Sequence, residues 1–139
     1  MWRKGKGEEI DAEIYMYISD NQDPSYKNIP GLTENATYGD SLWCGILKFK
    51  KKRWNSVVIT VKLNTFNGNK ANHDGLIMVS TNDITQRFDK LVYVDQKVNI
   101  KGITTDTFFG GGDKSWATPV DISIYFKNFM VTMSLKPKM

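Results

Sequence analysis

The stretch Asp106-Thr-Phe-Phe-Gly-Gly-Gly-Asp-Lys-Ser-Trp-Ala-Thr-Pro-Val-Asp-Ile-Ser-Ile-Tyr-Phe-Lys-Asn-Phe129 decides the fold class of this 139-residue chain. Its three consecutive glycines allow backbone conformations with positive φ, and Phe108, Phe109 and Trp116 supply apolar bulk that holds the loop. From residue 121 onward, apolar and polar residues alternate, which is the period of a half-buried strand. The stretch therefore predicts a structured loop that leads into a core strand.

Alternation of the same period recurs along the rest of the chain. It is clearest in residues 8–19, where Ile10, Ala12, Ile14, Met16 and Ile18 are expected to face one way. Further strands are predicted at residues 41–50, 54–64, 76–80, 90–94 and 98–105, and in residues 54–64 the side chains expected to point inward are Val57, Ile59, Val61 and Leu63. About seven strands separated by turn signals predict an all-β fold, an antiparallel β-sandwich of jelly-roll type.

Composition agrees with a packed β domain. Hydrophobic residues make up 40% and aromatic residues 12% of the chain, and 139 residues suit one domain that spans residues 1–139. Cys44 is the only cysteine, so an internal disulfide is excluded and a buried structural thiol is expected. The sequence contains neither a signal-like apolar run near Met1 nor a span of about 18 apolar residues, so we expect no membrane insertion.

The chain is mildly basic, with a formal net charge of +4 and a pI near 9.1. This charge suits an anionic polymer as ligand and equally suits a plain soluble protein. The run Lys50-Lys-Lys-Arg53 reads as a solvated turn, with contact to a polyanion as the other interpretation. Because the basic residues are not interleaved with exposed aromatic residues, we expect no nucleic-acid partner.

Most familiar catalytic signatures are absent. The sequence contains no P-loop, dinucleotide fingerprint, zinc-ligand spacing or nucleophile elbow. His73, the only histidine, lies beside Asp74-Gly75, where a turn role is expected. Four further carboxylates fall in loops where Asp favours turns, without a calcium motif: Asp20, Asp23, Asp83 and Asp113. We therefore expect no metal and no cofactor.

Tyr15 and Tyr17 are the best chemical candidates in the sequence. They are two residues apart on the polar face of the first strand, which puts both phenols on one side, roughly 6 to 7 Å apart along the chain. The alternative is that both are ordinary half-buried strand residues, since tyrosine is enriched in strands.

A set of short motifs, in order along nearly the whole chain, resembles polysaccharide lyase family 14, the alginate-lyase-like group. These motifs are Trp2-Arg3, Ile14-Tyr-Met-Tyr-Ile18, Asn28-Ile-Pro30, Tyr38-Gly-Asp-Ser41, Trp54-Asn55, Val61-Lys-Leu-Asn-Thr65, Asp74-Gly75, Thr107-Phe-Phe-Gly-Gly and Tyr125-Phe126. The Thr-Phe-Phe-Gly-Gly segment is the most specific of them. The resemblance implies a β jelly roll with an open cleft for an acidic polysaccharide such as alginate, and cleavage by β-elimination.

The resemblance also implies roles for particular residues. Tyr15 and Tyr17 match the two cleft tyrosines that the family links to catalysis. The family's other cleft residues, a lysine and a serine or threonine paired with an arginine, lie on segments that precede the Trp-Arg motif. That motif is Trp2-Arg3 here, so we expect those segments to be absent and do not equate Arg3 with the cleft arginine. The residues expected to contact substrate are Lys62, as a replacement for the missing lysine, with Tyr125, Arg3 and Glu13.

Two functions of different class therefore stay open. The first is a lyase acting on a uronate polysaccharide. The second is a non-catalytic carbohydrate-binding or surface protein with a vestigial lyase fold, and a purely structural domain is a weaker third. The resemblance implies an extracellular or cell-surface location, although no signal peptide is seen in this chain. Absent upstream strands also predict an exposed sheet edge, covered by the chain's own tail or by another chain in a homo-oligomer.

Overall fold

The computed structural model describes residues 1, 6–108, 110–111 and 113–134. The chain divides into two compact units, Met1–Ile100 and Lys101–Met139, which are described separately. The regular structure of the described residues consists of antiparallel strands and two short 3-10 helices. This confirms the predicted all-β, antiparallel fold, and the stacked sheets of the first unit agree with a β-sandwich. The jelly-roll topology stays a prediction.

One layer of the first unit is a two-stranded sheet. β1 (Glu9–Met16) pairs antiparallel with β2 (Asp40–Lys50). The ladder is interrupted where the single residue Glu13 of β1 lies opposite residues 43–46 of β2. The extra residues of β2 turn through positive φ at Trp43 (58°) and Gly45 (73°). Ala12 and Ile14 nevertheless both pack on the core side, because alternation resumes beyond the irregularity.

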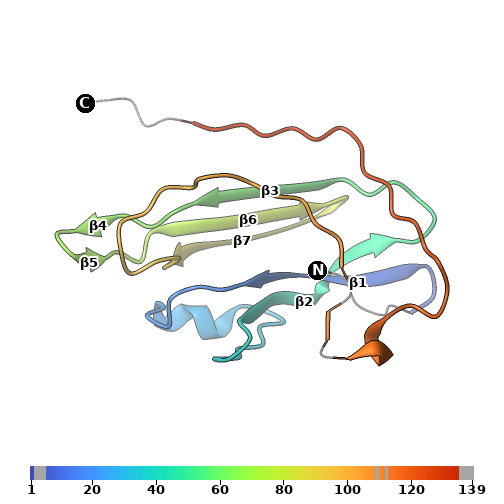
Figure 1. Cartoon of the computed structure of the whole chain (residues 1–139). Coiled ribbons are helices and arrows are strands. Elements are labelled where there is room, and N and C mark those ends of the chain that lie inside the picture. Colours follow the sequence, from blue (N-terminus) through green and yellow to red (C-terminus); the bar gives the residue numbers. More distant parts are fainter. Residues whose placement is uncertain (2–5, 109, 112, 135–139) are drawn as a thin grey trace. The chain divides into compact units, whose positions relative to one another are not determined.

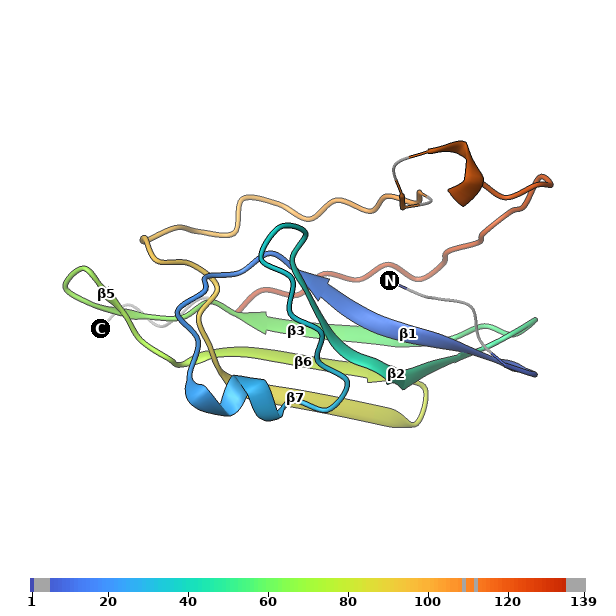
Figure 2. The same ribbon diagram turned by 90° about the horizontal axis from the view of Figure 1, so that it is seen from below.

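The other layer is the sheet β3-β6-β7, made of β3 (Val57–Lys62), β6 (Gly75–Thr81) and β7 (Ile84–Leu91). A separate small hairpin joins β4 (Phe66–Asn67) to β5 (Lys70–Ala71). Figures 1 and 2 show the β1–β2 sheet stacked on this layer. The buried core between the layers contains Ala12, Met16, Tyr26, Ile29, Leu42, Trp43, Leu47, Ile77, Val79 and Leu91. Apolar burial across this interface is the main stabilising term.

β3 differs from its sequence prediction. Its register places Val57, Ile59 and Val61 opposite Thr81, Val79 and Ile77, so they share the core-facing side of the sheet. They are nevertheless 41 to 54% exposed, and all six residues of β3 are exposed. The predicted inward direction of these side chains therefore agrees with the register, but they are not buried. Among the described strands, β3 pairs only with β6, so it lies at the edge of its layer. That layer has three strands and the opposite layer has two, so the opposite layer does not cover β3.

The connection between β1 and β2 is an ordered loop, as predicted. It contains the 3-10 helix η1 (Pro24–Asn28), whose N-cap Asp23 accepts a hydrogen bond from the Ser25 backbone N–H at 2.9 Å. Tyr26 and Ile29 anchor the loop in the core. Gly31 has φ +65°, and a Cβ there would lie 2.6 Å from the Cys44 carbonyl oxygen. The loop is therefore held closely against β2.

The second unit contains the glycine-rich loop. Gly111 has φ +114°, and a Cβ there would overlap the Trp116 ring, which follows in the 3-10 helix η2 (Lys114–Trp116). This agrees with the predicted glycine–aromatic loop; Phe109 and Gly112 lie outside the described residues. The predicted strands at residues 98–105 and 121–129 are wrong for the described residues, which form no ladder there. Alternation indicates which side chains share a face, but a strand also needs a partner backbone.

Candidate functional site

The two tyrosines singled out by the sequence lie together at the end of β1. Their ring centroids are 5.6 Å apart and the ring planes meet at 85°, an edge-to-face contact. Such a contact contributes about 0.5 to 1.5 kcal/mol beyond the burial of area. The core-side positions of Met16 and Ile18 leave Tyr17 on the outer face of the sheet, and Tyr17 is 76% exposed. Tyr17 therefore presents its ring and hydroxyl group outward, beside the half-buried Tyr15.

The loop before β2 holds the Tyr15 hydroxyl in place. Tyr15 Oη donates to the Tyr38 carbonyl oxygen. That carbonyl is in turn positioned by Asn35, whose Oδ1 accepts hydrogen bonds from the backbone N–H groups of Thr37 and Tyr38, both at 3.0 Å. Gly39 has φ +92°, and a Cβ there would lie 2.6 Å from the Met16 carbonyl oxygen, so only glycine lets the loop approach β1 this closely.

Two other tyrosines near the site are structural. Tyr26 Oη donates to Asp40 Oδ2 at 2.8 Å, and burial, followed by this contact, raises the pKa of Tyr26 above its usual range. Tyr93 Oη donates to the Leu76 carbonyl oxygen at 2.8 Å, and burial raises the pKa of Tyr93 as well. A tyrosine that acts as a base needs its pKa lowered, so neither residue suits that role.

A cavity of about 540 Å³ adjoins Tyr17 at the open end of β1. It is lined by Met16, Tyr17, Ile18, Asp20, Gln22, Tyr26, Lys27, Glu34, Asn35, Ala36, Thr37, Gly39, Asp40 and Tyr93. Its volume falls in the range of about 300 to 1,000 Å³ that is usual for ligand sites. Tyr17 therefore borders a hollow large enough for one monomer unit of a polymer.

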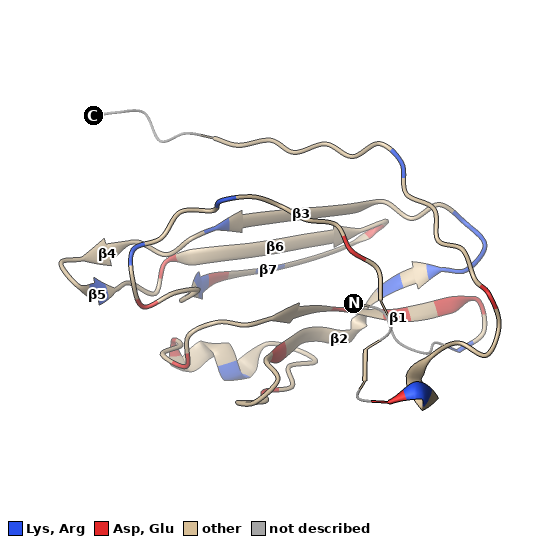
Figure 3. Ribbon diagram, in the orientation of Figure 1, with Lys and Arg blue, Asp and Glu red and all other residues tan. Residues whose placement is uncertain are grey.

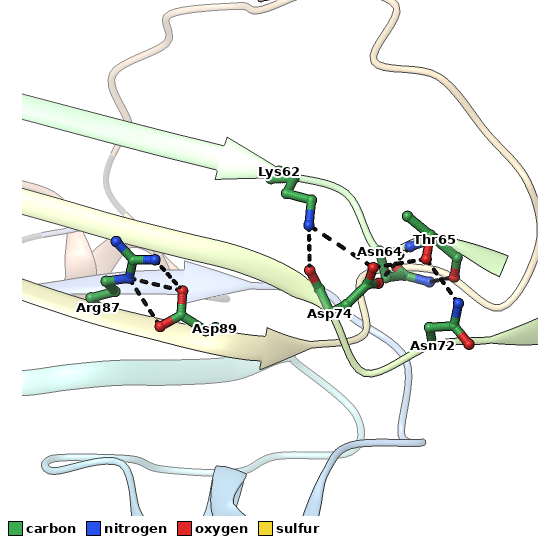
Figure 4. Close-up of polar contacts among 7 residues, drawn as sticks. All are labelled: Lys62, Asn64, Thr65, Asn72, Asp74, Arg87 and Asp89. Atoms are coloured by element: carbon green, nitrogen blue, oxygen red, sulfur yellow. Dashed lines mark hydrogen bonds and ion pairs between the residues drawn. The ribbon is translucent and has the colours of Figure 1, made fainter. Parts of the chain in front are cut away.

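Lys62 is held elsewhere. Its Nζ donates to the Asp74 carbonyl oxygen at 3.0 Å and lies 3.9 Å from Asp74 Oδ2 (Figure 4). Asp74 also accepts hydrogen bonds from the Thr65 N–H and hydroxyl, both at 2.7 Å. Lys62 alternates with Val61 on β3, which faces the core side, so Lys62 lies on the outer face of the other sheet. The structure does not bring Lys62 to the tyrosine pair.

The same outer face carries a second ion pair. Arg87 Nε donates to both carboxylate oxygens of Asp89, at 2.8 and 2.9 Å (Figure 4). This contact holds the pKa of Asp89 below its usual range and raises the pKa of Arg87. The basic groups on this face are therefore engaged with carboxylates.

The remaining predicted substrate contacts are dispersed. Glu13 is only 2% exposed, because it lies at the irregularity of the β1–β2 ladder rather than on the polar face that alternation predicts. The Met1 ammonium group donates to the Glu13 carbonyl oxygen at 2.7 Å. Tyr125 is 75% exposed in the second unit, and Arg3 lies outside the described residues. The structure therefore brings together Tyr15 and Tyr17, with Glu13 beneath the surface of the same strand.

Comparison with known families decides how these residues are interpreted. The family model described as polysaccharide lyase 14 matches residues 1–129. The chain belongs to the polysaccharide lyase 14 family. Its function is accordingly polysaccharide-lyase-like, and its partner is a polysaccharide. No curated protein and no solved structure matches the chain.

The sequence did not predict the polar groups that surround the tyrosine pair. The Tyr38 carbonyl, which accepts the Tyr15 hydrogen bond, is a backbone group and has no sequence signal of its own. The turn that positions this carbonyl does have a sequence signal, which is Asn35. Asparagine favours side-chain hydrogen bonds to backbone N–H groups two and three residues on, as Asn35 makes here. Asp40 was also missed as the partner of Tyr26.

The described part of this polysaccharide lyase 14 domain contains no group of three or more His, Cys, Asp or Glu side chains that could hold a metal ion. Nor does any helix within the described ranges have the length and apolar character needed to cross a membrane.

Proposed function

We propose that the chain acts on or binds an acidic, uronate-containing polysaccharide, with Tyr15 and Tyr17 at the centre of the site. The observation that carries the proposal is the edge-to-face tyrosine pair at the end of β1, whose exposed member Tyr17 lines a cavity of about 540 Å³, in a polysaccharide lyase 14 domain. An exposed aromatic ring offers an apolar face for a sugar ring, and the hydroxyl groups supply directed hydrogen bonds.

The proposed reaction is β-elimination. A base removes the proton from C5 of a uronate, the electron pair forms the C4–C5 double bond, and the C4–O bond breaks as an acid protonates the leaving oxygen. Tyr15 is assigned the acid, because its hydroxyl donates to the Tyr38 carbonyl oxygen and is thereby held in a fixed position beside Tyr17. Tyr17, the more exposed phenol, is left to face the C5 proton.

A second candidate function is a binding role without turnover. A phenolate base and the developing charge on the uronate carboxylate both need a nearby cation. Lys62, the residue expected to supply it, is engaged by Asp74 on the other sheet. This observation favours a non-catalytic carbohydrate-binding protein that keeps the aromatic part of a lyase site.

The test follows ultraviolet absorbance while the purified chain is incubated with alginate, polymannuronate, polyguluronate or glucuronan, because the eliminated uronate carries a new absorbing double bond. Tyr17→Phe is compared with Tyr38→Phe, which removes an exposed hydroxyl but keeps the backbone carbonyl that holds Tyr15. A rise that only Tyr17→Phe abolishes supports the lyase.

A flat trace calls for the same samples to be tested for retention on the immobilised polymers. Retention that Tyr17→Phe weakens and Tyr38→Phe leaves unchanged supports the binding role. If the unsubstituted chain neither cleaves nor retains any of the four polymers, the assignment of the site is wrong.

Further parts of the proposal concern location and assembly. We expect the protein to work outside the cell or at its surface, where such polymers are found. Homo-oligomerisation through an exposed sheet edge would use β3, whose six residues are all exposed. Arg3 and Tyr125 stay predictions as substrate contacts, and Glu13, which is buried, would act by positioning β1.

A further inference from the structure

The end of β2 and the turn that follows it carry a dense group of cations, Lys50, Lys51, Lys52 and Arg53, called the basic turn from here on (Figure 3). Lys50 Nζ lies 3.9 Å from Asp83 Oδ2, and Lys51 Nζ donates to the Gly7 carbonyl oxygen at 2.7 Å. Within the part of the chain that the structure describes, Lys52 and Arg53 make no ion pair. At Lys52 and Arg53 the basic turn therefore exposes positive charge that no described residue neutralises in an ion pair.

The basic turn is clamped in one conformation. Asn55 Oδ1 accepts a hydrogen bond from the Lys50 N–H at 2.8 Å, and Asn55 Nδ2 donates to the carbonyl oxygens of Lys50 and Arg53 at 2.9 and 3.1 Å. Asn82, in the β6–β7 turn, donates to the same Asn55 Oδ1 at 2.9 Å. Lys52 takes φ +55° within this frame. Because the backbone that carries the cations is held, binding of a polyanion there costs less conformational entropy than binding to a mobile loop would.

The basic turn and the tyrosine pair lie at opposite ends of one sheet face. The ladder places Lys50 opposite Glu9, at the start of β1, and places Ser41 opposite Tyr15, near its end. Ala12, Ile14 and Met16 pack on the core side, so by alternation Glu9 and Tyr15 share the outer side. Tyr15 lies six residue steps along the strand from Glu9, which corresponds to roughly 20 Å.

The surface between the two ends does not repel an acidic polymer strongly. Asp11 lies directly opposite Lys48 on this face, and Lys48 Nζ forms an ion pair with Asp11 Oδ1. At the far end, a hollow of about 230 Å³ is lined by Glu8, Glu9, Lys50, Lys51 and Arg53. Three of these lining side chains are cations and two are carboxylates, so positive charge is in excess at the hollow.

We propose that the basic turn is a second anchoring site for the same acidic polysaccharide, binding carboxylates of the chain roughly 20 Å from the sugar at the tyrosine pair. This inference rests on the proposed function. It implies that affinity depends on the length of the polysaccharide. A polymer that spans both ends of the β1–β2 face binds through aromatic contact at one end and through charge at the other. A short oligosaccharide reaches the tyrosine pair alone.

The experiment compares a long polyuronate with a uronate disaccharide as ligands for the full chain, by calorimetry at several salt concentrations. The double variant Lys52→Gln/Arg53→Gln removes the two unpaired cations. Lys70→Gln/Lys97→Gln, which removes two exposed lysines elsewhere, is the control with the same net charge. Tyr17→Phe reports on the tyrosine pair. Thermal unfolding of each variant checks that the fold is kept.

We expect the Lys52/Arg53 variant to bind the polymer roughly three- to tenfold more weakly at low salt, with a shallower salt dependence, and to bind the disaccharide unchanged. The control should bind both ligands like the unsubstituted chain. If Tyr17→Phe weakens polymer binding but the Lys52/Arg53 variant behaves like the control, the second anchoring site is refuted and the proposed function stands. If the unsubstituted chain binds no polyuronate, both are refuted.

Discussion

Replacing Gly31 by alanine tests how tightly the loop that carries Tyr38 is held against β2. Gly31 has φ +65°, and an added Cβ would lie 2.6 Å from Cys44 O, 2.8 Å from Cys44 N and 3.1 Å from Trp43 C. These neighbours are backbone atoms, and Cys44 N–H also donates to the Gly31 carbonyl oxygen at 3.0 Å. The loop and β2 must therefore separate to admit the methyl group.

The expected cost has two parts. A non-glycine residue in the left-handed region costs about 1 to 2 kcal/mol. Forcing packed atoms apart costs about 1 to 3 kcal/mol more. Gly68→Ala is the matched control, because Gly68 has φ +58° but no atom lies within 4 Å of an added Cβ. We expect Gly31→Ala to destabilise the fold by about 1 to 3 kcal/mol more than Gly68→Ala does.

The assay is urea unfolding, followed by the fluorescence of the four tryptophans, of which Trp43 is 1% exposed. Stability differences are taken from the midpoints when the two variants have the same m-value. Equal midpoint shifts for Gly31→Ala and Gly68→Ala would refute the close contact between the loop and β2. A larger shift for Gly31→Ala would support it.

Three further predictions concern stability. Leu47→Ala should lower the free energy of unfolding by about 2 to 5 kcal/mol in urea, because Leu47 is 1% exposed. Ile46→Ala, at a position 38% exposed, should cost clearly less. Similar losses for the two variants would contradict the core assignment. Because burial and a carboxylate contact raise the pKa of Tyr26 above its ordinary 10.0, its stabilising contribution is complete below pH 10 and falls as the pH rises further. Tyr26→Phe should therefore flatten the alkaline decline in urea midpoints, and an unchanged slope would argue against it. The hydrogen bonds from Ser25 lower the pKa of Asp23 from its ordinary 3.8, so its contribution is present above that pH and is lost as the pH falls through the lower folded value. Asp23→Asn should show a smaller loss of midpoint between pH 5 and pH 2, and an equal loss would contradict the prediction.

Strands whose burial is decided locally could be predicted from the sequence. Residues 8–19, 41–50 and 76–80 cover β1 and most of β2 and β6, because alternation, turn residues and strand propensity agree there. The exposure of Val57 and Ile59 could not be predicted in the same way. It depends on how far the opposite layer extends, and that width comes from the pairing of distant segments. Residues 121–129 alternate as clearly as β1 does, yet no described partner backbone pairs with them.

In the candidate site, too, local spacing could be predicted and contacts between distant segments could not. The nearness of Tyr15 and Tyr17 follows from the two-residue period alone, and the structure places their rings in contact. The position of Glu13 could not be predicted, because the ladder irregularity at this residue is set by the extra residues of β2. Lys62 is expected at the site only as a replacement for the family's missing lysine. Its distance from the tyrosine pair depends on which sheet β3 joins. Local spacing is readable in a sequence, whereas contact across sheets is not.

The exposure of all six residues of β3 has a consequence for handling the protein. The strand reads Val-Val-Ile-Thr-Val-Lys, with no proline or glycine and one charge at its end. Short segments of high β-propensity and low charge stack readily into cross-β fibrils when they are exposed at an edge. Lys62, which closes the segment, thereby acts as a gatekeeper against fibril growth. Neutralising this lysine would favour amyloid-like assembly of the folded protein during concentration, independently of any effect on polysaccharide binding.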